Sequence, residues 1–276
     1  MKKILVSIVF AACLSGCSAG FMYNNLDWLV HWYIDDYVEL NSEQKSAFDR
    51  YMKNWLTWHR SQELVIYRDH LSELRQRIDK TPLTQQQWLN EFERARVHWF
   101  RLLDELDEDI SDLSLKLTDD QLVSIFDELE QQNQKREKRR QNRDKNWRLD
   151  NLKEDVVRWT GPLSEPQEQM LKVYSGQLKE NFEDWMQYRR KWQSEAKNVL
   201  MNRKNTDQWR QAMSSILLNP DQFRHPQYRQ KSDHNRHIYA TMLAELHASL
   251  SAQQKSHLHN EIGELIEDLN DLVDDT

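Results

Sequence analysis

A short phrase recurs five times in this chain: Leu, then Asn, Ser or Thr, then two residues of any type, then Gln. In such a phrase the side-chain oxygen of the second residue accepts a hydrogen bond from a free backbone N–H, and the Gln side chain returns to the cap backbone. The preceding Leu can hold the incoming chain as a hydrophobic staple. Each copy therefore predicts the start of a helix, and the copies begin at Leu40, Leu83, Leu117, Leu163 and Leu250.

Apolar residues between these starts follow the helical period. From Trp88 to Leu117 they recur at intervals of three and four residues, and the same pattern runs from Leu258 to Leu272. No comparably long stretch alternates as a strand would. We therefore expect helices near 25–39, 42–79 (either straight or bent near Ser61), 84–116, 119–159, 164–203, 206–218, 227–249 and 252–273.

The scarcity of Gly and Pro, five of each, excludes several other folds. Rossmann units, P-loops and multi-turn β-sandwiches need glycine in their turns and phosphate loops. The chain also has 11 Trp, 9 Tyr and 8 Phe, which supply enough apolar surface for a core and argue against general disorder. We predict an all-α fold, an elongated bundle of seven or eight helices with no sheet. Residues 26–276 are expected to form a single helical domain, or two sub-bundles joined by the long helix 119–159.

The first residues predict an export signal. Lys2 and Lys3 precede an apolar run, 4–14, that is too short to span a bilayer. The run ends in 14–17, Leu-Ser-Gly-Cys, which resembles the lipobox of bacterial lipoproteins. The resemblance implies a signal peptide over 1–16, lipid on Cys17, and a lipidated tether over 17–25. An ordinary signal peptide with a chance Cys is the alternative.

The predicted anchor bears on location and on partners. In the lipoprotein class, Ser18 rather than Asp after the Cys implies the outer membrane, with the protein facing the periplasm and held to the membrane by the lipid on Cys17. The formal net charge is −7, and loss of Lys2 and Lys3 makes the mature chain still more acidic. This balance argues against nucleic acid as a partner. With Cys13 removed and Cys17 lipidated, no thiol remains for catalysis or for metal binding.

A basic stretch departs from the amphipathic pattern. No apolar residue occurs over 130–146, whereas 135–148 holds eight Lys and Arg against two acids. Arg136, Arg139, Arg140 and Arg143 share one side of the expected helix and form a possible anion-binding strip. The alternatives are a solvated helix face, because such a stretch cannot face an apolar core, and internal pairing with the acidic segment 104–130. We favour these two over binding of a partner.

Patterns that carry chemistry are few. The chain has no H-E-x-x-H zinc pattern and no G-x-S-x-G serine elbow. The C-terminal histidines from His225 to His259, which include His234 and His237, are interpreted as surface or cap residues. We predict no catalytic residues, no metal, no cofactor and no enzymatic activity.

Two family resemblances follow from the motifs. The lipobox, the aromatic opening 28–37, the cap at 40–44 and the segment 159–167 (W-T-G-P-L-S-x-x-Q) together resemble an uncharacterised family of Gram-negative lipoproteins. That resemblance implies an all-α lipoprotein and supplies no activity. The L-T-x-x-Q phrases at Leu83 and Leu117 are also similar to those of periplasmic stress chaperones, which are much shorter.

The function expected from these observations is non-catalytic. We predict an outer-membrane-anchored, periplasm-facing lipoprotein that acts as a binding or scaffold protein of the cell envelope, with an envelope protein as partner. The alternative is a holdase-like periplasmic chaperone that shields unfolded clients on amphipathic helical faces.

Overall fold

The structure is a computed structural model that describes residues 17–203 and 208–274. Every regular element within those ranges is helical, and they contain no strand. The all-α class predicted from the sequence is therefore confirmed. The predicted signal peptide, 1–16, lies outside the described residues.

The helices and their bounds are α2 (Cys17–Asn24), α3 (Leu26–Ile34), α4 (Ser42–Trp58), η1 (His59–Glu63, a π-helix), α5 (Leu64–Lys80), α6 (Gln85–Lys116), α7 (Asp119–Gln141), α8 (Trp147–Thr160), α9 (Glu165–Gln177), α10 (Phe182–Met201), α11 (Trp209–Leu218), η2 (Pro220–Phe223, a 3-10 helix), α12 (Pro226–Ser249) and α13 (Ala252–Asp274).

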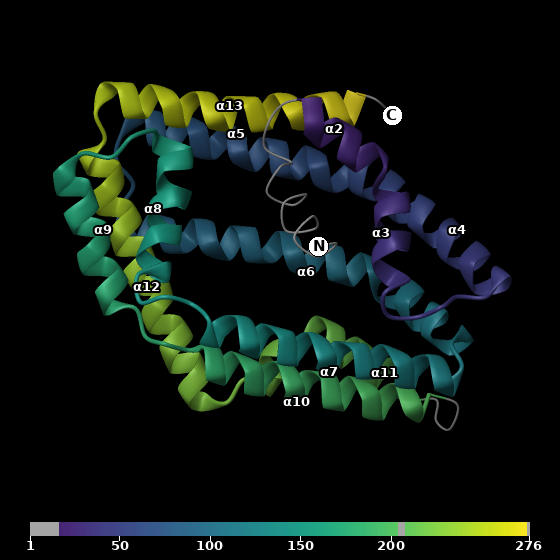
Figure 1. Ribbon diagram of the computed structural model, residues 1–276. Coiled ribbons are helices and arrows are strands. Elements are labelled where there is room, and N and C mark those ends of the chain that lie inside the picture. Colours follow the sequence, from purple (N-terminus) through teal and green to yellow (C-terminus); the bar gives the residue numbers. More distant parts are fainter. Residues whose placement is uncertain (1–16, 204–207, 275–276) are drawn as a thin grey trace.

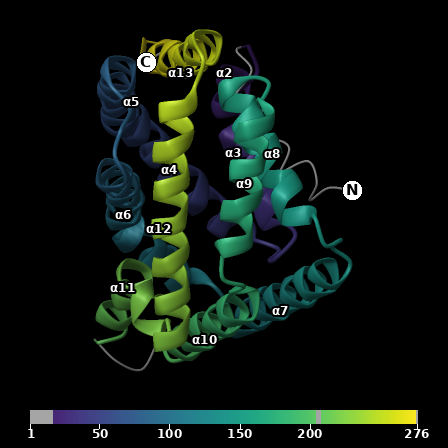
Figure 2. The same cartoon turned by 90° about the vertical axis from the view of Figure 1, so that its left-hand side faces the viewer.

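The helices pack in groups around α6, which runs through the middle of the view in Figure 1. Along one edge α5 and α13 lie side by side, and along the opposite edge α7 packs on α10 and α11 packs on α6. Helix α12 crosses from one edge to the other and contacts both α6 and α9, as Figure 2 shows from the side. Helices α3 and α4 close the far end (Figure 1).

Two helices that the sequence analysis expected to be continuous are broken. The expected helix 119–159 ends as α7 at Gln141, and α8 begins at Trp147. Between them the carboxylate of Asp144 accepts a 2.7 Å hydrogen bond from the backbone N–H of Asn146, which forms a turn. Asn and Asp side chains compete with the helix in this way. The single long helix proposed to join two sub-bundles is therefore wrong.

The expected helix 164–203 is likewise broken, between α9 and α10. Here Asn235 of α12 holds the backbone of Lys179, since its side chain accepts from the Lys179 N–H at 2.7 Å and donates to the Lys179 C=O at 2.9 Å. A tertiary contact thus satisfies backbone groups that would otherwise continue the helix. These two breaks raise the number of helices above the seven or eight expected.

All five predicted helix starts are confirmed. Capping boxes with side-chain bonds in both directions open α4, α6, α7, α9 and α13. The boxes also pair across the fold: Gln44 of α4 lies against Gln121 of α7, and Gln167 of α9 lies against Gln254 of α13. The phrase therefore joins the N-termini of two helices as well as starting each one.

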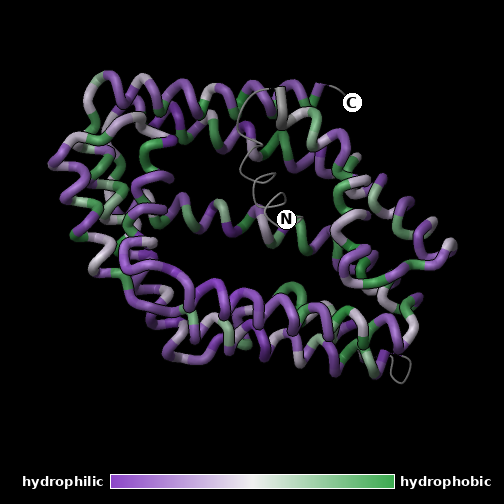
Figure 3. Tube along the Cα trace, in the orientation of Figure 1, coloured by the Kyte–Doolittle hydropathy of each residue, from purple (hydrophilic) through white to green (hydrophobic). Residues whose placement is uncertain are grey.

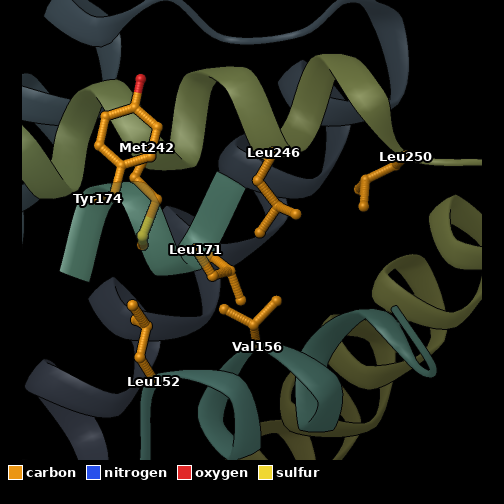
Figure 4. Close-up of a cluster of buried hydrophobic side chains, with 7 residues drawn as sticks. All are labelled: Leu152, Val156, Leu171, Tyr174, Met242, Leu246 and Leu250. Carbon is orange, nitrogen blue, oxygen red and sulfur yellow. The ribbon is translucent and has the colours of Figure 1, made fainter. Parts of the chain in front are cut away.

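Buried apolar side chains form separate clusters between the helices. Figure 4 shows the one between α8, α9 and α12, which contains Leu152, Val156, Leu171, Tyr174, Met242, Leu246 and Leu250. A second cluster, around the fully buried Leu122, joins α7 to α10 and α11. A third, which includes Ile78 and Ile262, holds α5 to α13. The first cluster holds α8 and α9 to α12, and the second holds α7 to α10 and α11, so together they position the turn between α7 and α8.

The expected tether is largely helical. Residues 17–24 form α2, which packs against α13, and the hydroxyl of Tyr23 lies 2.9 Å from Nδ1 of His59. The structure thus describes Cys17 as the first residue of a helix attached to the body of the protein. The Cys17 side chain lies outside what the structure describes.

Candidate anion-binding pocket

The four arginines of the predicted strip lie near the end of α7, but they do not share one environment. Arg140 and Arg143 line a pocket of about 800 Å³ at the turn between α7 and α8. Arg136 and Arg139 lie outside it and are exposed. The guanidinium of Arg136 is 5.8 Å from the ring centroid of Trp185, and Arg139 makes no ion pair or hydrogen bond within the described ranges.

The pocket is built where five helices and one turn meet. The end of α7 and the turn 142–146 form one side, the first residues of α8 and α10 form another, and α9 and α12 close it. In Figure 3 the end of α7 is strongly hydrophilic. The lining residues are Arg140, Arg143, Asp144, Lys145, Asn146, Trp147, Arg148, Leu149, Lys172, Ser175, Gly176, Glu180, Asn181, Phe182, Trp185, Tyr228 and Tyr239.

Positive charge exceeds negative charge in this pocket. Its five Lys and Arg residues face two carboxylates, Asp144 and Glu180. Glu180 is already shared, since Arg140 and Arg148 lie 2.5 and 2.8 Å from the same oxygen. Asp144 is engaged in the turn. Within the described residues, Lys145 and Lys172 make no ion pair or hydrogen bond.

Arg143 is held in place by an aromatic ring and has no carboxylate in contact. Its guanidinium carbon lies 3.4 Å from the ring centroid of Trp147, which is a close cation–π contact. Burial and the neighbouring charge of Arg140 lower the pKa of the Arg143 guanidinium from its usual value. The charge of Glu180 acts in the opposite direction, so burial and Arg140 together outweigh this carboxylate.

Internal pairing of the strip with the acidic segment 104–130, one of the alternatives, is not the arrangement found. The strip's ion pair in the described ranges is that of Arg140 with Glu180, a residue outside that segment. Glu130, at the end of the segment, instead binds Arg190 of α10, which also binds Glu137. Within the described residues, Glu130 pairs with Arg190 of α10 and Asp112 pairs with Arg210 of α11, and no arginine of the strip pairs with the segment.

The apolar-free part of α7 also faces a buried interface, contrary to expectation. Asn133 is fully buried against α10, where its amide donates to Gln193 at 2.7 Å and its oxygen accepts from Arg189 at 2.7 Å. Polar side chains can be buried when each finds a partner. The absence of apolar residues therefore does not make this helix face solvated.

The sequence analysis missed several pocket residues. Arg148 belongs to the same basic run and could have been included on charge alone. Lys172 and Gly176 of α9 carried no signal, because only the folded chain brings α9 beside the α7–α8 turn.

The histidines are placed as follows. His225 caps α12, and His234 faces the backbone oxygen of Gln177 at 3.0 Å. His247 corrects the surface-or-cap interpretation, because it is 4% exposed and lies between the N–H of Leu83 and the C=O of Ile78. Across the described residues no three His, Cys, Asp or Glu gather as metal ligands.

A second polar cluster, which the sequence analysis did not single out, joins α5 to α6. Nδ1 of His70 lies 2.8 Å from Nε2 of His98, and Nε2 of His70 lies 2.8 Å from a Glu91 oxygen. Arg77 also binds Glu91. Burial, followed by the charge of His70, lowers the pKa of His98. These contacts fasten two helices together.

The structure also contains two apolar cavities. One of about 620 Å³ lies between α3, α4 and α6, and one of about 880 Å³ lies between α5, α6, α8, α12 and α13.

Within the part of the chain that the structure describes, none of the helices combines the length and the apolar character of a membrane span.

The fold and the pocket define an all-helical protein with a basic, aromatic-lined cavity. Comparison with known proteins then places the chain in a family. Residues 36–229 match the model of a family of unknown function, DUF6279, and the chain belongs to that family. The expected membership of an uncharacterised family is confirmed. No curated protein and no solved structure matches the chain.

Proposed function

We propose that this chain is an outer-membrane lipoprotein that faces the periplasm and acts as a non-catalytic binding protein of the cell envelope. The basic pocket at the α7–α8 turn carries the proposal. It combines concave shape, surplus positive charge and aromatic walls, which are features of binding sites for anionic ligands. The partner is an envelope component that presents anionic groups.

The anchor part of the proposal is supported by the lipobox-like residues 14–17 and by α2. Because α2 begins at Cys17 and packs on α13, a lipid on Cys17 would hold the body of the protein close to the membrane. Replacement of Cys17 by Ala should leave the protein soluble in the periplasm, as judged by fractionation of cell envelopes. Unchanged recovery with outer membranes would contradict the anchor.

The binding part is tested by two triple variants with equal charge change. Arg143→Gln/Lys145→Gln/Lys172→Gln removes pocket cations that have no carboxylate in contact. Arg136→Gln/Lys138→Gln/Arg139→Gln removes exposed cations outside the pocket. Partners are captured by cross-linking in intact cells and purification of the chain. The pocket variant should lose its cross-linked partner and the outer variant should keep it. Equal loss or equal retention would contradict binding at the pocket.

A holdase role is the second candidate, and the two apolar cavities favour it. Both linings are mainly Leu, Ile, Val and aromatic side chains, which could receive apolar groups of an unfolded client. The larger cavity also has polar lining residues, among them Asp155, Asn235 and Arg236. Suppression of the aggregation of an unrelated denatured protein at near-stoichiometric ratio tests this role. The role is supported if the Arg143→Gln/Lys145→Gln/Lys172→Gln variant suppresses aggregation as well as wild type does. Leu106→Asp, in the cavity lined by α3, should then suppress aggregation less.

A further inference from the structure

We propose that the basic pocket binds a phosphorylated hexose, as a free sugar phosphate or as the head of an envelope glycolipid. This inference deepens the proposed binding function and rests on it. It assigns separate parts of the pocket to the phosphate and to the sugar ring. Four observations support it: the cations without an ion pair, the two helix N-termini, the aromatic and amide lining, and one glycine.

The cations define the place of the phosphate. Arg143, Lys145 and Lys172 come from the turn and from α9, and within the described residues none of their side chains forms an ion pair. The charge of Glu180 reaches Arg143, but Arg140 and Arg148 already share that carboxylate. A phosphate monoester carries up to two negative charges and accepts several hydrogen bonds at neutral pH. It therefore supplies the charge that this side of the pocket lacks, and an Arg beside two Lys can bind it by charge-assisted hydrogen bonds.

Two helix N-termini add to the positive potential. Both α8 and α10 begin at the pocket, with Asn146 and Asn181 as their N-caps. Neither Asn side chain makes a cap hydrogen bond, although Asn caps commonly do. At the start of α10 the N–H of Phe182 already donates to Glu180 at 3.1 Å. The remaining N–H groups at the two helix starts favour an anion, and the two side-chain amides are available to hydroxyl groups of a ligand.

The aromatic residues define the place of the sugar ring. Trp147, Phe182, Trp185, Tyr228 and Tyr239 line the same volume as the cations. The C–H face of a pyranose packs on aromatic rings, while its hydroxyls need amide and hydroxyl partners of the kind that this lining supplies. The volume of about 800 Å³ lies within the usual range for small-ligand sites. A flat acidic patch on a protein would not enter so concave a space.

Gly176 is the observation that protein packing does not explain. It lies in the last turn of α9, it lines the pocket, and a Cβ built there would meet nothing within 4 Å. Gly destabilises a helix relative to Ala, so its place needs a reason. The left-handed region is not that reason, because the positive-φ glycine within the described residues is Gly161. Space for a ligand is a reason that fits.

The proposal is tested by calorimetric titration of the full mature chain carrying Cys17→Ser. The probes are glucosamine 1-phosphate, inorganic phosphate, glucosamine and adenosine monophosphate. Glucosamine 1-phosphate should bind at least tenfold more tightly than each of the others. Equal affinity for inorganic phosphate would overturn the sugar part and leave anion binding intact. Tighter binding of adenosine monophosphate would overturn the hexose assignment in favour of a nucleotide.

The variants separate binding from folding. Gly176→Phe should abolish binding of glucosamine 1-phosphate with little change in melting temperature, because the new side chain occupies open space. Arg143→Gln/Lys172→Gln should weaken binding at least tenfold, and Arg136→Gln/Arg139→Gln should not. Unimpaired binding by Gly176→Phe would place the ligand elsewhere and overturn the proposal. If no partner is captured by cross-linking and none of the four probes binds, the proposed binding function itself is overturned.

The two sources of the hexose phosphate are distinguished with vesicles. Vesicles of phosphatidylethanolamine with and without lipid A, a phosphorylated hexosamine glycolipid, are sedimented with the same Cys17→Ser chain. Co-sedimentation that depends on lipid A and is competed by glucosamine 1-phosphate assigns the glycolipid source. Binding of the free sugar phosphate without such co-sedimentation assigns the soluble source.

Discussion

Gln44 and Gln121 exchange two hydrogen bonds of 2.8 Å, so that each side-chain amide donates to the oxygen of the other. The same two side chains complete the capping boxes of α4 and α7 and reach the backbone oxygens of Lys116 and Glu39. Gln167 and Gln254 repeat the arrangement between α9 and α13. Each pair couples two helix starts, and this coupling can be measured.

We expect Gln44→Ala and Gln121→Ala each to lower the free energy of unfolding by about 1–3 kcal/mol, because each leaves buried polar groups without partners. The double variant should lose less than the sum, with a coupling energy of about 0.5–3 kcal/mol. Urea denaturation of the four proteins provides the cycle. Gln87 is the matched control, since it caps α6 without a partner Gln. Additive effects of Gln44→Ala and Gln121→Ala would contradict the coupling.

The sequence predicted these caps but not their pairing, and the difference is physical. A capping box is local, since Asn41 and Gln44 are three residues apart, so the phrase itself indicates it. The contact between Gln44 and Gln121 depends on how α4 and α7 meet, which apolar periodicity does not determine. The break of the expected helix 119–159 was readable in principle, because Asn142, Asp144 and Asn146 are residues that favour turns.

The pocket residues likewise include some that the sequence predicted and some that it did not. Arg140 and Arg143 were predicted because they belong to an unusual run of charge. The run itself did not separate them from Arg136 and Arg139, since the turn after Gln141 decides which arginines face the pocket. Lys172 and Gly176, on α9, are brought there by the apolar cluster that packs α9 on α8 and α12.

His247 predicts a loss of stability in weak acid. Burial lowers its pKa from 6.5, and the hydrogen bond with the Ile78 C=O offsets only part of this effect. The neutral ring accepts from the Leu83 N–H at Nδ1 and faces the Ile78 C=O through Nε2. Protonation at Nδ1 would place two donors together. The unfolded chain therefore takes up this proton at higher pH than the folded chain does, and the stability is complete above about pH 6.5 and falls as the pH decreases below it.

Urea unfolding at pH 7.5 and at pH 5.5 measures this effect. We expect a lower free energy of unfolding at pH 5.5 than at pH 7.5. His247→Gln should be less stable at pH 7.5 but should lose less on acidification. His98, whose pKa burial also lowers, contributes in the same direction, and His98→Gln separates its share. An equal pH dependence in wild type and in His247→Gln would contradict the assignment.

Asn133 predicts that α7 is held by a buried polar contact. Asn133→Ala would leave Gln193 and Arg189 of α10 without their partner, and we expect a loss of about 2 kcal/mol in the free energy of unfolding. Gln134→Ala, on the exposed side of the same turn, should change stability by less than about 0.5 kcal/mol. Guanidinium denaturation of the two variants checks the difference, and equal small effects would show that this part of α7 is solvated.

The arginine strip itself should contribute little to stability. We expect Arg136→Gln/Arg139→Gln to stay within about 0.5 kcal/mol of wild type, because both side chains are exposed. Arg190→Gln removes only one positive charge but should lower the free energy of unfolding by more, about 1 kcal/mol, because Arg190 binds both Glu130 and Glu137. This figure is discounted for solvent, since Arg190 is 38% exposed.

The pH dependence separates Arg190 from the strip. Hydrogen bonds from Arg190 lower the pKa of Glu130 and Glu137 below 4.5. Folded carboxylates with lowered pKa stabilise the protein fully above the unfolded value and lose that contribution as the pH falls below it. Between pH 5 and pH 3, wild type and Arg136→Gln/Arg139→Gln should therefore lose stability more steeply than Arg190→Gln, as measured by urea midpoints. If Arg136→Gln/Arg139→Gln instead showed the shallower dependence of stability on pH, the strip would be what neutralises Glu130 and Glu137. The ion pairs between α7 and α10 would then not be what stabilises this edge of the fold.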